Sequence, residues 1–273
     1  MLSPFVSRYW IMRSDVAHSK LAHPVEYPVE HPIVPNGRVK LLFNFADDFL
    51  LEYRDRAQSN LSEPIVVGQM STPALITSTG RIGVMGVEFH PAGALPFLGV
   101  PQIELSGTVL DIGMFTYSRW HRELYDGLRM TGDDAARVAL MDRALSKLYD
   151  RSRSRVGLQA LEFVDALNQA GPFASIVEIA QRLNCKPRRL ERRFRDYVGL
   201  SPKRMQRIMR LQYAFAMHRG RPERSWVELA LDAGYFDQPH FIKDFRALTG
   251  YSPTDFTKRQ TVIAAAFAHT RDF

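Results

Sequence analysis

The sequence is poor in cysteine, since Cys185 is the only one among its 273 residues. A single thiol excludes a disulfide framework and any metal site that needs several cysteines. No apolar run approaches the roughly 18 residues of a membrane-spanning helix. Residues 1–15 also lack the basic start and apolar block of an export signal. These absences favour a soluble, cytoplasmic protein.

Sequence motifs of catalysis are missing as well. The chain has no Gly-x-Ser-x-Gly, His-Glu-x-x-His, Walker loop or dinucleotide fingerprint. Asp47 and Asp48 are adjacent carboxylates, but neighbouring side chains in a strand or turn point apart, so we expect a solvated loop there. We therefore expect no catalytic residues and no cofactor.

The charge is divided unevenly along the chain. Residues 1–150 contain 14 Lys and Arg against 17 Asp and Glu, a net charge of −3. Residues 151–273 contain 22 against 12, a net charge of +10. The length is enough for two domains, each with its own core. We expect only the C-terminal half to meet a polyanion such as a nucleic acid.

Residues 1–132 are predicted to be rich in β-strands. Short apolar runs at 40–45 and 81–89 are bounded by Pro, Gly, Asn and Asp. Two tripeptides predict turns, because Asn and Gly tolerate a positive φ: Pro35-Asn36-Gly37 and Pro91-Ala92-Gly93. Many short strands with regular turns indicate a barrel or a sandwich.

From residue 133 the apolar spacing becomes that of an amphipathic helix. One stripe recurs at steps of three and four residues: Val138, Met141, Leu145 and Leu148. As a dimer contact the stripe would pair with a second protomer, and as structure it would cover the barrel of its own chain. Residues 133–155 are predicted to contain this helix and a polar linker at 150–155. Residues 156–262 are predicted to be helical, with 263–273 as a tail.

The C-terminal half contains an internal repeat, at residues 175–205 and 225–256. The pattern Ser-x-Val-Glu-x-Ala begins at Ser175 and recurs at Ser225. After one inserted residue the repeat continues with Phe-Arg, Gly and Ser-Pro, at an offset of 51. Each unit begins with a Ser-x-x-Glu capping box, which predicts the start of a helix.

The same repeat predicts a tight turn and a second helix in each unit. Asn184 and Gly234 occupy matching positions suited to a left-handed helix end. A second helix follows, with Pro187 tolerated in its first turn and Asp237 as an expected N-cap, and it ends at Gly199 or Gly250. Helix, tight turn and second helix make a helix-turn-helix unit.

The second helices have polar outer faces. With about 100° per residue, an inner apolar face of the first one contains Leu190, Phe194, Tyr197 and Val198. The outward positions are Arg188, Arg192 and Arg195, with Arg189 and Arg193 on a flank and Glu191 as the acid. In the second unit Phe241, Phe245 and Leu248 face inward, and the outward positions are Gln238, Pro239, His240, Lys243 and Arg246. Arginines on such a face can bind phosphates and guanine edges, whereas a protein-interaction module should be mixed or apolar there.

Residues 172–260 resemble the DNA-binding domain of the AraC/XylS family of bacterial regulators. The matching motifs include Leu190-Glu191-Arg192-Arg193-Phe194-Arg195, Ala233-Gly234-Tyr235-Phe236-Asp237-Gln238 and Thr249-Gly250-Tyr251-Ser252-Pro253. The resemblance implies that each second helix enters a major groove and that a helix starting near Lys203 holds the units apart. The base-reading positions that it implies are Arg188, Glu191, Arg192, Gln238, His240 and Lys243. Lys186 and Pro239 depart from the family pattern, in which an N-capping Ser or Thr and a small polar residue are usual.

The N-terminal part is similar to the small cupin-like barrel that precedes this domain in one subgroup of the family. The motifs are Pro35-Asn36-Gly37, Leu41-Leu42-Phe43-Asn44, Phe89-His90-Pro91-Ala92-Gly93-Ala94 and Phe97-Leu98-Gly99-Val100-Pro101. The resemblance implies effector binding or dimerisation. Five aromatic residues could line a pocket or belong to the core: Trp10, Phe43, Phe45, Tyr53 and Phe97. Arg38 and Arg81 are candidates to recognise an acidic effector, although the sequence places neither in a pocket.

Metal binding is the alternative for this half. Its four histidines lack the close His-x-His pair and following Glu usual in metal-binding cupins: His18, His23, His31 and His90. We therefore expect no metal site.

The fold expected is α+β with two domains, a cupin-like β-barrel or sandwich followed by an all-α domain of two tandem helix-turn-helix units joined by a long helix. The function expected is a sequence-specific transcription regulator that binds double-stranded DNA under control of a small-molecule effector or oligomerisation. A homodimer and contact with RNA polymerase are expected partnerships. The alternatives are an enzyme, a metal-binding cupin or a protein-interaction module.

Overall fold

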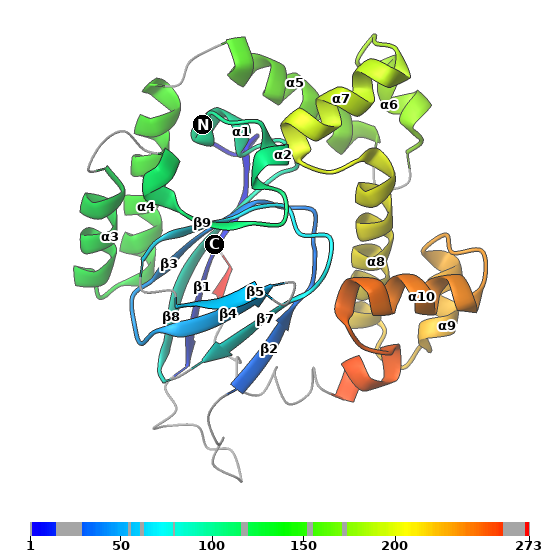
Figure 1. Ribbon diagram of the computed structural model, residues 1–273, viewed down its shortest axis with the longest axis horizontal. Helices are drawn as coiled ribbons and strands as arrows, with labels where there is room; N and C mark the ends of the chain where they lie inside the picture. Colours follow the sequence, from blue (N-terminus) through cyan, green and yellow to red (C-terminus); the bar gives the residue numbers. More distant parts are fainter. Residues whose placement is uncertain are drawn as a thin grey trace.

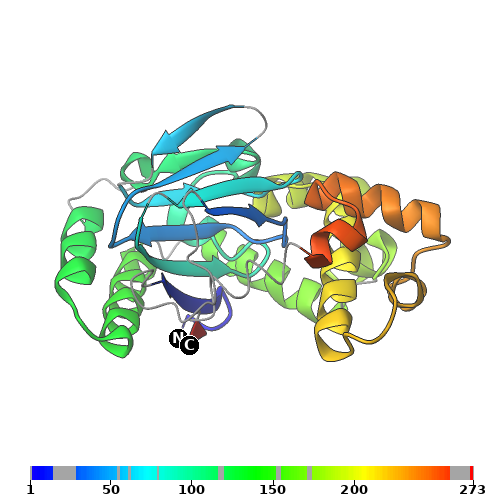
Figure 2. The same ribbon diagram turned by 90° about the horizontal axis from the view of Figure 1, so that it is seen from below.

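A computed structural model describes residues 2–14, 29–53, 56–60, 63–78, 80–115, 120–151, 155–170, 174–258 and 271–272. A layered β region with two covering helices lies beside a helical region (Figures 1 and 2). This arrangement confirms the α+β, two-domain fold expected from the sequence. Among the described residues, no helix is long and apolar enough to cross a membrane.

The strands are short, and most lie in the N-terminal region. Their bounds are β1 Val6–Ser14, β2 Val29–Ile33, β3 Lys40–Asn44, β4 Phe49–Tyr53, β5 Arg56–Asn60, β6 Ile65–Val67, β7 Ala74–Ser78, β8 Ile82–Phe89, β9 Val109–Asp111 and β10 Arg271–Asp272. The helices are α1 Leu95–Leu98, α2 Gln102–Leu105, the 3-10 helix η2 Ile112–Phe115, α3 Trp120–Met130, α4 Asp134–Arg151, α5 Arg155–Ala170, α6 Ile176–Arg182, α7 Pro187–Val198, α8 Pro202–Gly220, α9 Trp226–Asp232 and α10 Gln238–Thr249.

The strands form two antiparallel sheets. One has six strands in the order β10-β1-β8-β3-β6-β9, and the other has four in the order β2-β7-β4-β5. The apolar runs predicted at 40–45 and 81–89 are β3 and β8, which pair so that Lys40 lies opposite Glu88. Strand β10 pairs with β1, so residues near both ends of the chain lie side by side (Figure 2).

The two predicted turns are present, but one works differently from the expectation. Gly37 has a φ of +72°, as expected for its turn. In the second tripeptide the positive φ of 69° is at Ala92 and not at Gly93. Gly93 is required by space, because a Cβ there would lie 2.3 Å from the Phe5 carbonyl oxygen. The sequence predicted the turn. It did not predict that Ala92 takes the positive φ or that Gly93 makes room for the Phe5 carbonyl.

Helix α4 covers the six-stranded sheet of its own chain. Met141 and Leu145 are fully buried in a core shared with Met85 and Phe89 of β8. Val138 and Leu148, the other members of the predicted stripe, pack against the same core. Of the two interpretations of this stripe, the structure therefore supports the covering role, and the stripe is not free for a dimer contact. Helix α3, which packs beside α4, was not anticipated from the sequence.

The predicted polar linker at 150–155 falls where one helix ends and the next begins. Helix α4 extends to Arg151 and α5 begins at Arg155. Residues 152–154, between these two helices, lie outside the described residues.

The helical region has a separate core built from both repeats. Its buried members include Leu190 and Phe194 of α7, Leu211 of α8, and Phe241 and Phe245 of α10. Helix α8 runs between the two units as the long connecting helix (Figure 1). The core thus joins both units to one helix.

Candidate DNA-binding surface and interdomain cavity

Both units start with the predicted capping box. The Ser175 amide donates to the Glu178 carboxylate at 2.6 Å, and the Glu178 amide donates to the Ser175 hydroxyl at 3.2 Å. The same bonds between Ser225 and Glu228 measure 2.9 and 3.3 Å. The bond from the serine amide holds the pKa of each capping glutamate below its ordinary value. Helices α6 and α9 therefore begin in the same way.

The turns between the helices also match. Asn184 has a φ of +44° and Gly234 a φ of +74°, so both residues adopt the predicted left-handed conformation. After them, the Cys185 amide donates to the Ala180 carbonyl at 2.9 Å and the Tyr235 amide to the Ala230 carbonyl at 3.0 Å. The duplicated sequence thus folds into two equivalent helix-turn-helix units.

The second helices start differently. At α7 the N-cap is Lys186, whose side chain makes no capping bond. At α10 the N-cap is Asp237, whose carboxylate accepts from the His240 amide at 2.8 Å. Pro239 lies in the first turn of α10, where its missing N–H leaves no helical bond unmade. Both helices end at a left-handed glycine, Gly199 or Gly250.

The structure places the predicted DNA-binding side chains on the solvent-exposed faces of α7 and α10. The exposed residues are Arg188, Arg189, Glu191, Arg192, Arg195, Gln238, His240, Lys243 and Arg246. Arg193 differs, because its side chain is 14% exposed and lies over the Tyr197 ring, 3.9 Å from Glu162. Neither helix turns its polar face inward.

An ion pair between helices, formed by a buried acid and a half-buried arginine, was missed from the sequence. Asp244 of α10 is buried, and the Arg207 guanidinium of α8 lies 2.7 Å from its Oδ1. An inward acid on a cationic helix is a signal that could have been noticed at the helical spacing of Phe241 and Phe245. The pair fixes α10 on the connecting helix.

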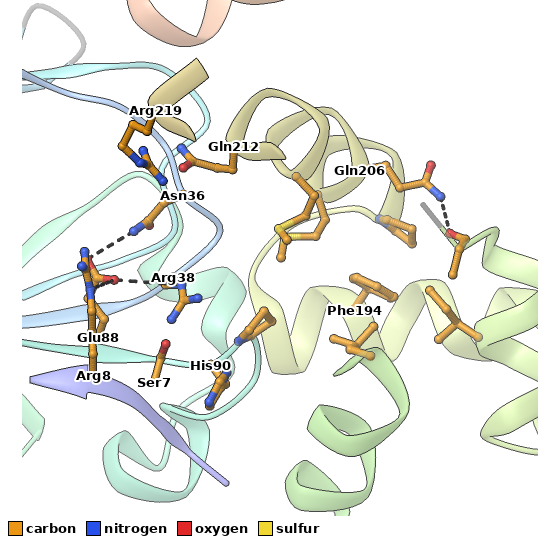
Figure 3. A pocket seen from close by; sticks show the side chains of 17 residues that line it. Ser7, Arg8, Asn36, Arg38, Glu88, His90, Phe194, Gln206, Gln212 and Arg219 are labelled. Carbon is orange, nitrogen blue, oxygen red and sulfur yellow. Dashed lines mark hydrogen bonds and ion pairs between the residues drawn. The ribbon is translucent and has the colours of Figure 1, made fainter. Parts of the chain in front are cut away.

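Two adjoining cavities of about 480 and 390 Å³ lie between the β region and α8, and Figure 3 shows the larger of the two. They share Arg8, Asn36 and Glu88 from the β region and Gln212 and Arg219 from α8. Beside them, the side-chain amide of Gln212 donates to the Pro35 carbonyl at 2.8 Å across the domain boundary.

Glu88 lies at the centre of the polar lining. Arg8 Nε donates to it at 3.1 Å, Asn36 Nδ2 donates at 3.2 Å, and Arg38 Nε lies 3.9 Å away. Burial alone would raise the pKa of Glu88, but Lys40 and the two arginines hold it below its ordinary value. Burial lowers the pKa of Lys40 and Arg38, and the attraction of Glu88 opposes that shift. This part of the cavity is therefore cationic and carries an ionised carboxylate.

Other candidates from the sequence lie elsewhere. Arg81 binds Asp47 on the surface, with its amide 2.8 Å from the carboxylate, so of the two candidate arginines only Arg38 lines a described cavity. Trp10 lines the smaller cavity, while Phe43, Tyr53 and Phe97 are core residues and Phe45 packs beside the core. His90 lines the larger cavity and His31 lies in β2, whereas His18 and His23 lie outside the described residues. Within the described part of the chain, no group of three or more His, Cys, Asp or Glu is placed to hold a metal ion.

Comparison with known families gives two matches. Residues 179–259 match a helix-turn-helix domain, and residues 1–111 match a domain of unknown function, DUF6597. No curated protein matches the chain significantly.

The chain is also similar to solved structures of ToxT from Vibrio cholerae. One is 13% identical with a TM-score of 0.49, covering 92% of this chain and 98% of ToxT. ToxT bound to (E)-4-(8-methylnaphthalen-1-yl)but-3-enoic acid is 14% identical with a TM-score of 0.48, covering 92% and 98%. Unsaturated fatty acid bound ToxT is 11% identical with a TM-score of 0.48, covering 92% and 95%. Because these TM-scores are below 0.5 and the identities are below 25%, the assignment of the two domains rests on the family matches at 1–111 and 179–259.

The match at 179–259 begins within α6, covers the rest of both units and agrees with the AraC/XylS resemblance of their motifs. Residues 179–259 are therefore an AraC-type helix-turn-helix domain, and the chain is a DNA-binding transcription regulator with an N-terminal domain of the DUF6597 family.

Proposed function

We propose that this regulator binds specific DNA sequences by placing α7 and α10 in successive major grooves of one duplex. The observation that carries the proposal is the pair of matching units with exposed polar helices, joined by the 19-residue helix α8. At 1.5 Å per residue, α8 is about 28 Å long. With the width of the units added, this length suits recognition helices about one turn of DNA apart, ~34 Å.

The exposed side chains have the chemistry for this task. Arg188 and Arg192 can each make two bonds to guanine O6 and N7, and Gln238 can pair with adenine. Glu191 can accept from cytosine N4, and His240 and Lys243 complete the implied base-reading set. Arg189, Arg195 and Arg246, at the flanks of these positions, suit phosphate contacts that set the register.

A salt titration of DNA binding tests the proposal. We expect a mobility shift with the promoter region next to the protein's own gene, and a steep loss of affinity with salt that reflects on the order of 6–10 phosphate contacts. Near-constant affinity between low and physiological salt would contradict it. An enzyme or a protein-interaction module should give no sequence-preferring shift.

We further infer that the N-terminal domain controls DNA binding through a small-molecule effector. The cavities between the domains support this role, since they are of the size of ligand sites, about 300–1,000 Å³. This regulator would act in the cytoplasm without catalysis. It would form a homodimer and contact RNA polymerase. Because the α4 stripe is buried, a homodimer would have to form through another surface. Sedimentation at micromolar protein concentration would show whether the protein is a dimer.

A further inference from the structure

We propose that the ring of Phe236 contacts the 5-methyl group of a thymine at the edge of the major groove that α10 enters. This inference rests on the proposed DNA binding by α7 and α10. It adds a base-contacting residue outside the base-reading positions that the family resemblance implies. Three features support it: the place of Phe236 in the repeat, the exposure of its ring, and the chemistry of the residues beside it.

Phe236 is the residue by which the second unit is longer than the first. Up to Tyr235 the two turns match, because its amide makes the same backbone hydrogen bond as the amide of Cys185. In the first unit the next residue, Lys186, is already the N-cap of the second helix. In the second unit the N-cap, Asp237, comes one residue later. The extra residue therefore lies between the turn and the start of α10, where the first unit has no counterpart.

The side chain of this extra residue points into solvent. Phe236 is 90% exposed, whereas Tyr235 directly before it is 3% exposed and belongs to the core. One exposed apolar side chain is common on protein surfaces, so its position decides what it can meet. Burying an aromatic ring against an apolar group is favourable in proportion to the area removed from water. The fold makes little use of the Phe236 ring, and a partner can therefore bury it.

The position of Phe236 is at the end of α10 that approaches the bases. Helix-turn-helix proteins present the N-terminal residues of the second helix to base edges in the major groove. Phe236 directly precedes the N-cap Asp237 and is two residues before Gln238, the first residue of α10. The Asp237 carboxylate between them is occupied by the His240 amide at 2.8 Å. The ring therefore continues the exposed face of α10 that we propose to enter the groove.

The chemistry of the ring selects thymine among the groups that DNA presents. A phenyl ring cannot neutralise a phosphate, and in the major groove thymine is the base that carries a methyl group. Gln238 can pair with adenine, so both residues at the start of α10 suit A·T base pairs. The first unit differs, because Lys186 and Arg188 place cations at the start of α7. The inserted Phe236 therefore gives the second unit a base preference that the first unit lacks.

Replacement of thymine by uracil tests the contact, because it removes the 5-methyl group and leaves base pairing unchanged. Each thymine in the promoter fragment that the full chain protects is replaced singly by deoxyuridine, and the dissociation constant is measured by fluorescence anisotropy. We expect one position at which the replacement weakens binding about fourfold, as for the loss of one buried methyl group. A scan in which no replacement weakens binding by more than about twofold would overturn the proposal.

Variants at Phe236 assign the methyl contact to this ring. Phe236→Ala should weaken binding to the thymine fragment about tenfold and should abolish the difference between thymine and uracil at the sensitive position. Phe236→Leu keeps an apolar side chain and should retain most of that difference. Met130→Ala is the matched control and should change neither quantity, since Met130 is 88% exposed in α3, on the opposite side of the β region from α10 (Figure 1). Because both side chains are exposed, all three variants should unfold at the temperature of the parent.

The thymine contact can be separated from DNA binding itself. If Phe236→Ala binds DNA as tightly as the parent, the ring serves a protein partner or none, and this inference fails while the proposed DNA binding stands. If Phe236→Ala binds more weakly but still distinguishes thymine from uracil, the ring contacts the DNA backbone, and the inference fails as well. If the full chain binds no promoter DNA, the proposed function fails and this inference fails with it.

Discussion

Helices α7 and α10 occupy equivalent places in the two units, yet they present different surfaces. The exposed face of α7 has four arginines and one glutamate, whereas that of α10 has Gln238, His240, Lys243 and Arg246. The outward face of α7 is therefore strongly cationic and that of α10 is mostly polar. Phosphate attraction is sensitive to salt, and amide contacts to bases are less so. We therefore expect the first unit to supply more of the affinity for DNA and the second more of the sequence discrimination.

The units also differ in how rigidly each is held. Phe245 of α10 packs against the rings of Phe215, Trp226, Phe241 and Phe256. The equivalent Phe194 of α7 packs its ring against that of Phe163. The first unit is instead supported by the N-terminal domain, since a Cβ on Gly199 would lie 2.5 Å from the Gln102 carbonyl of α2. Within the shared core, the second unit is therefore held by a larger cluster of aromatic rings, and the first also packs against the N-terminal domain.

Truncation of the core phenylalanines should have the largest effect, and the loss of stability should differ between the two units. We expect Phe245→Ala to lower the free energy of unfolding by about 4 kcal/mol and Phe194→Ala by about 3 kcal/mol, because Phe245 stands in the larger cluster of packed rings. Denaturant unfolding monitored by circular dichroism measures both. A larger destabilisation by Phe194→Ala would contradict this difference in ring packing.

Removal of the α7 arginines should weaken DNA binding in a salt-dependent way. We expect the double variant Arg189→Ala, Arg195→Ala, which removes the proposed phosphate contacts of α7, to weaken the binding free energy by about 3 kcal/mol at low salt. The slope of affinity against salt should also fall by about one for each phosphate that is no longer neutralised. Fluorescence anisotropy over a salt series measures both quantities. Arg129→Ala, an exposed arginine of α3, is the control and should change neither.

Substitution in α10 should instead relax sequence preference. We expect Gln238→Ala to cost about 2 kcal/mol on the preferred site and much less on an unrelated sequence. The salt slope should stay as in the parent because an uncharged amide is removed. A uniform decrease in affinity on all sequences would mean that Gln238 contacts the DNA backbone and not a base.

The N-caps should give the smallest difference. Asp237→Ala removes the bond to the His240 amide and should destabilise the chain by about 1 kcal/mol. Lys186→Ser introduces the missing cap at α7 and should stabilise it by about 0.5–1 kcal/mol. Thermal unfolding reports both changes, and equal signs for the two variants would contradict the capping difference.

Local sequence signals predicted the helical region well, because each depends on residues a few positions apart. The capping boxes, the left-handed Asn184 and Gly234, and the ends at Gly199 and Gly250 all follow from backbone hydrogen bonding and conformational preference. The missing side-chain cap at Lys186 was visible for the same reason. Periodicity also separated the buried Phe241 and Phe245 from the exposed positions beside them.

By itself the sequence determined the two-domain fold, the duplicated units and which faces of α7 and α10 meet water. Tertiary structure alone decided that the α4 stripe covers its own sheet, that Asp244 pairs with Arg207, and that Arg38 and Arg219 line one interdomain hollow. These contacts join residues distant in the chain, and neither periodicity nor capping carries information about which distant surfaces pack together. Arg38 and Arg81 looked alike in the sequence, and only packing placed one in a cavity and the other on a surface carboxylate.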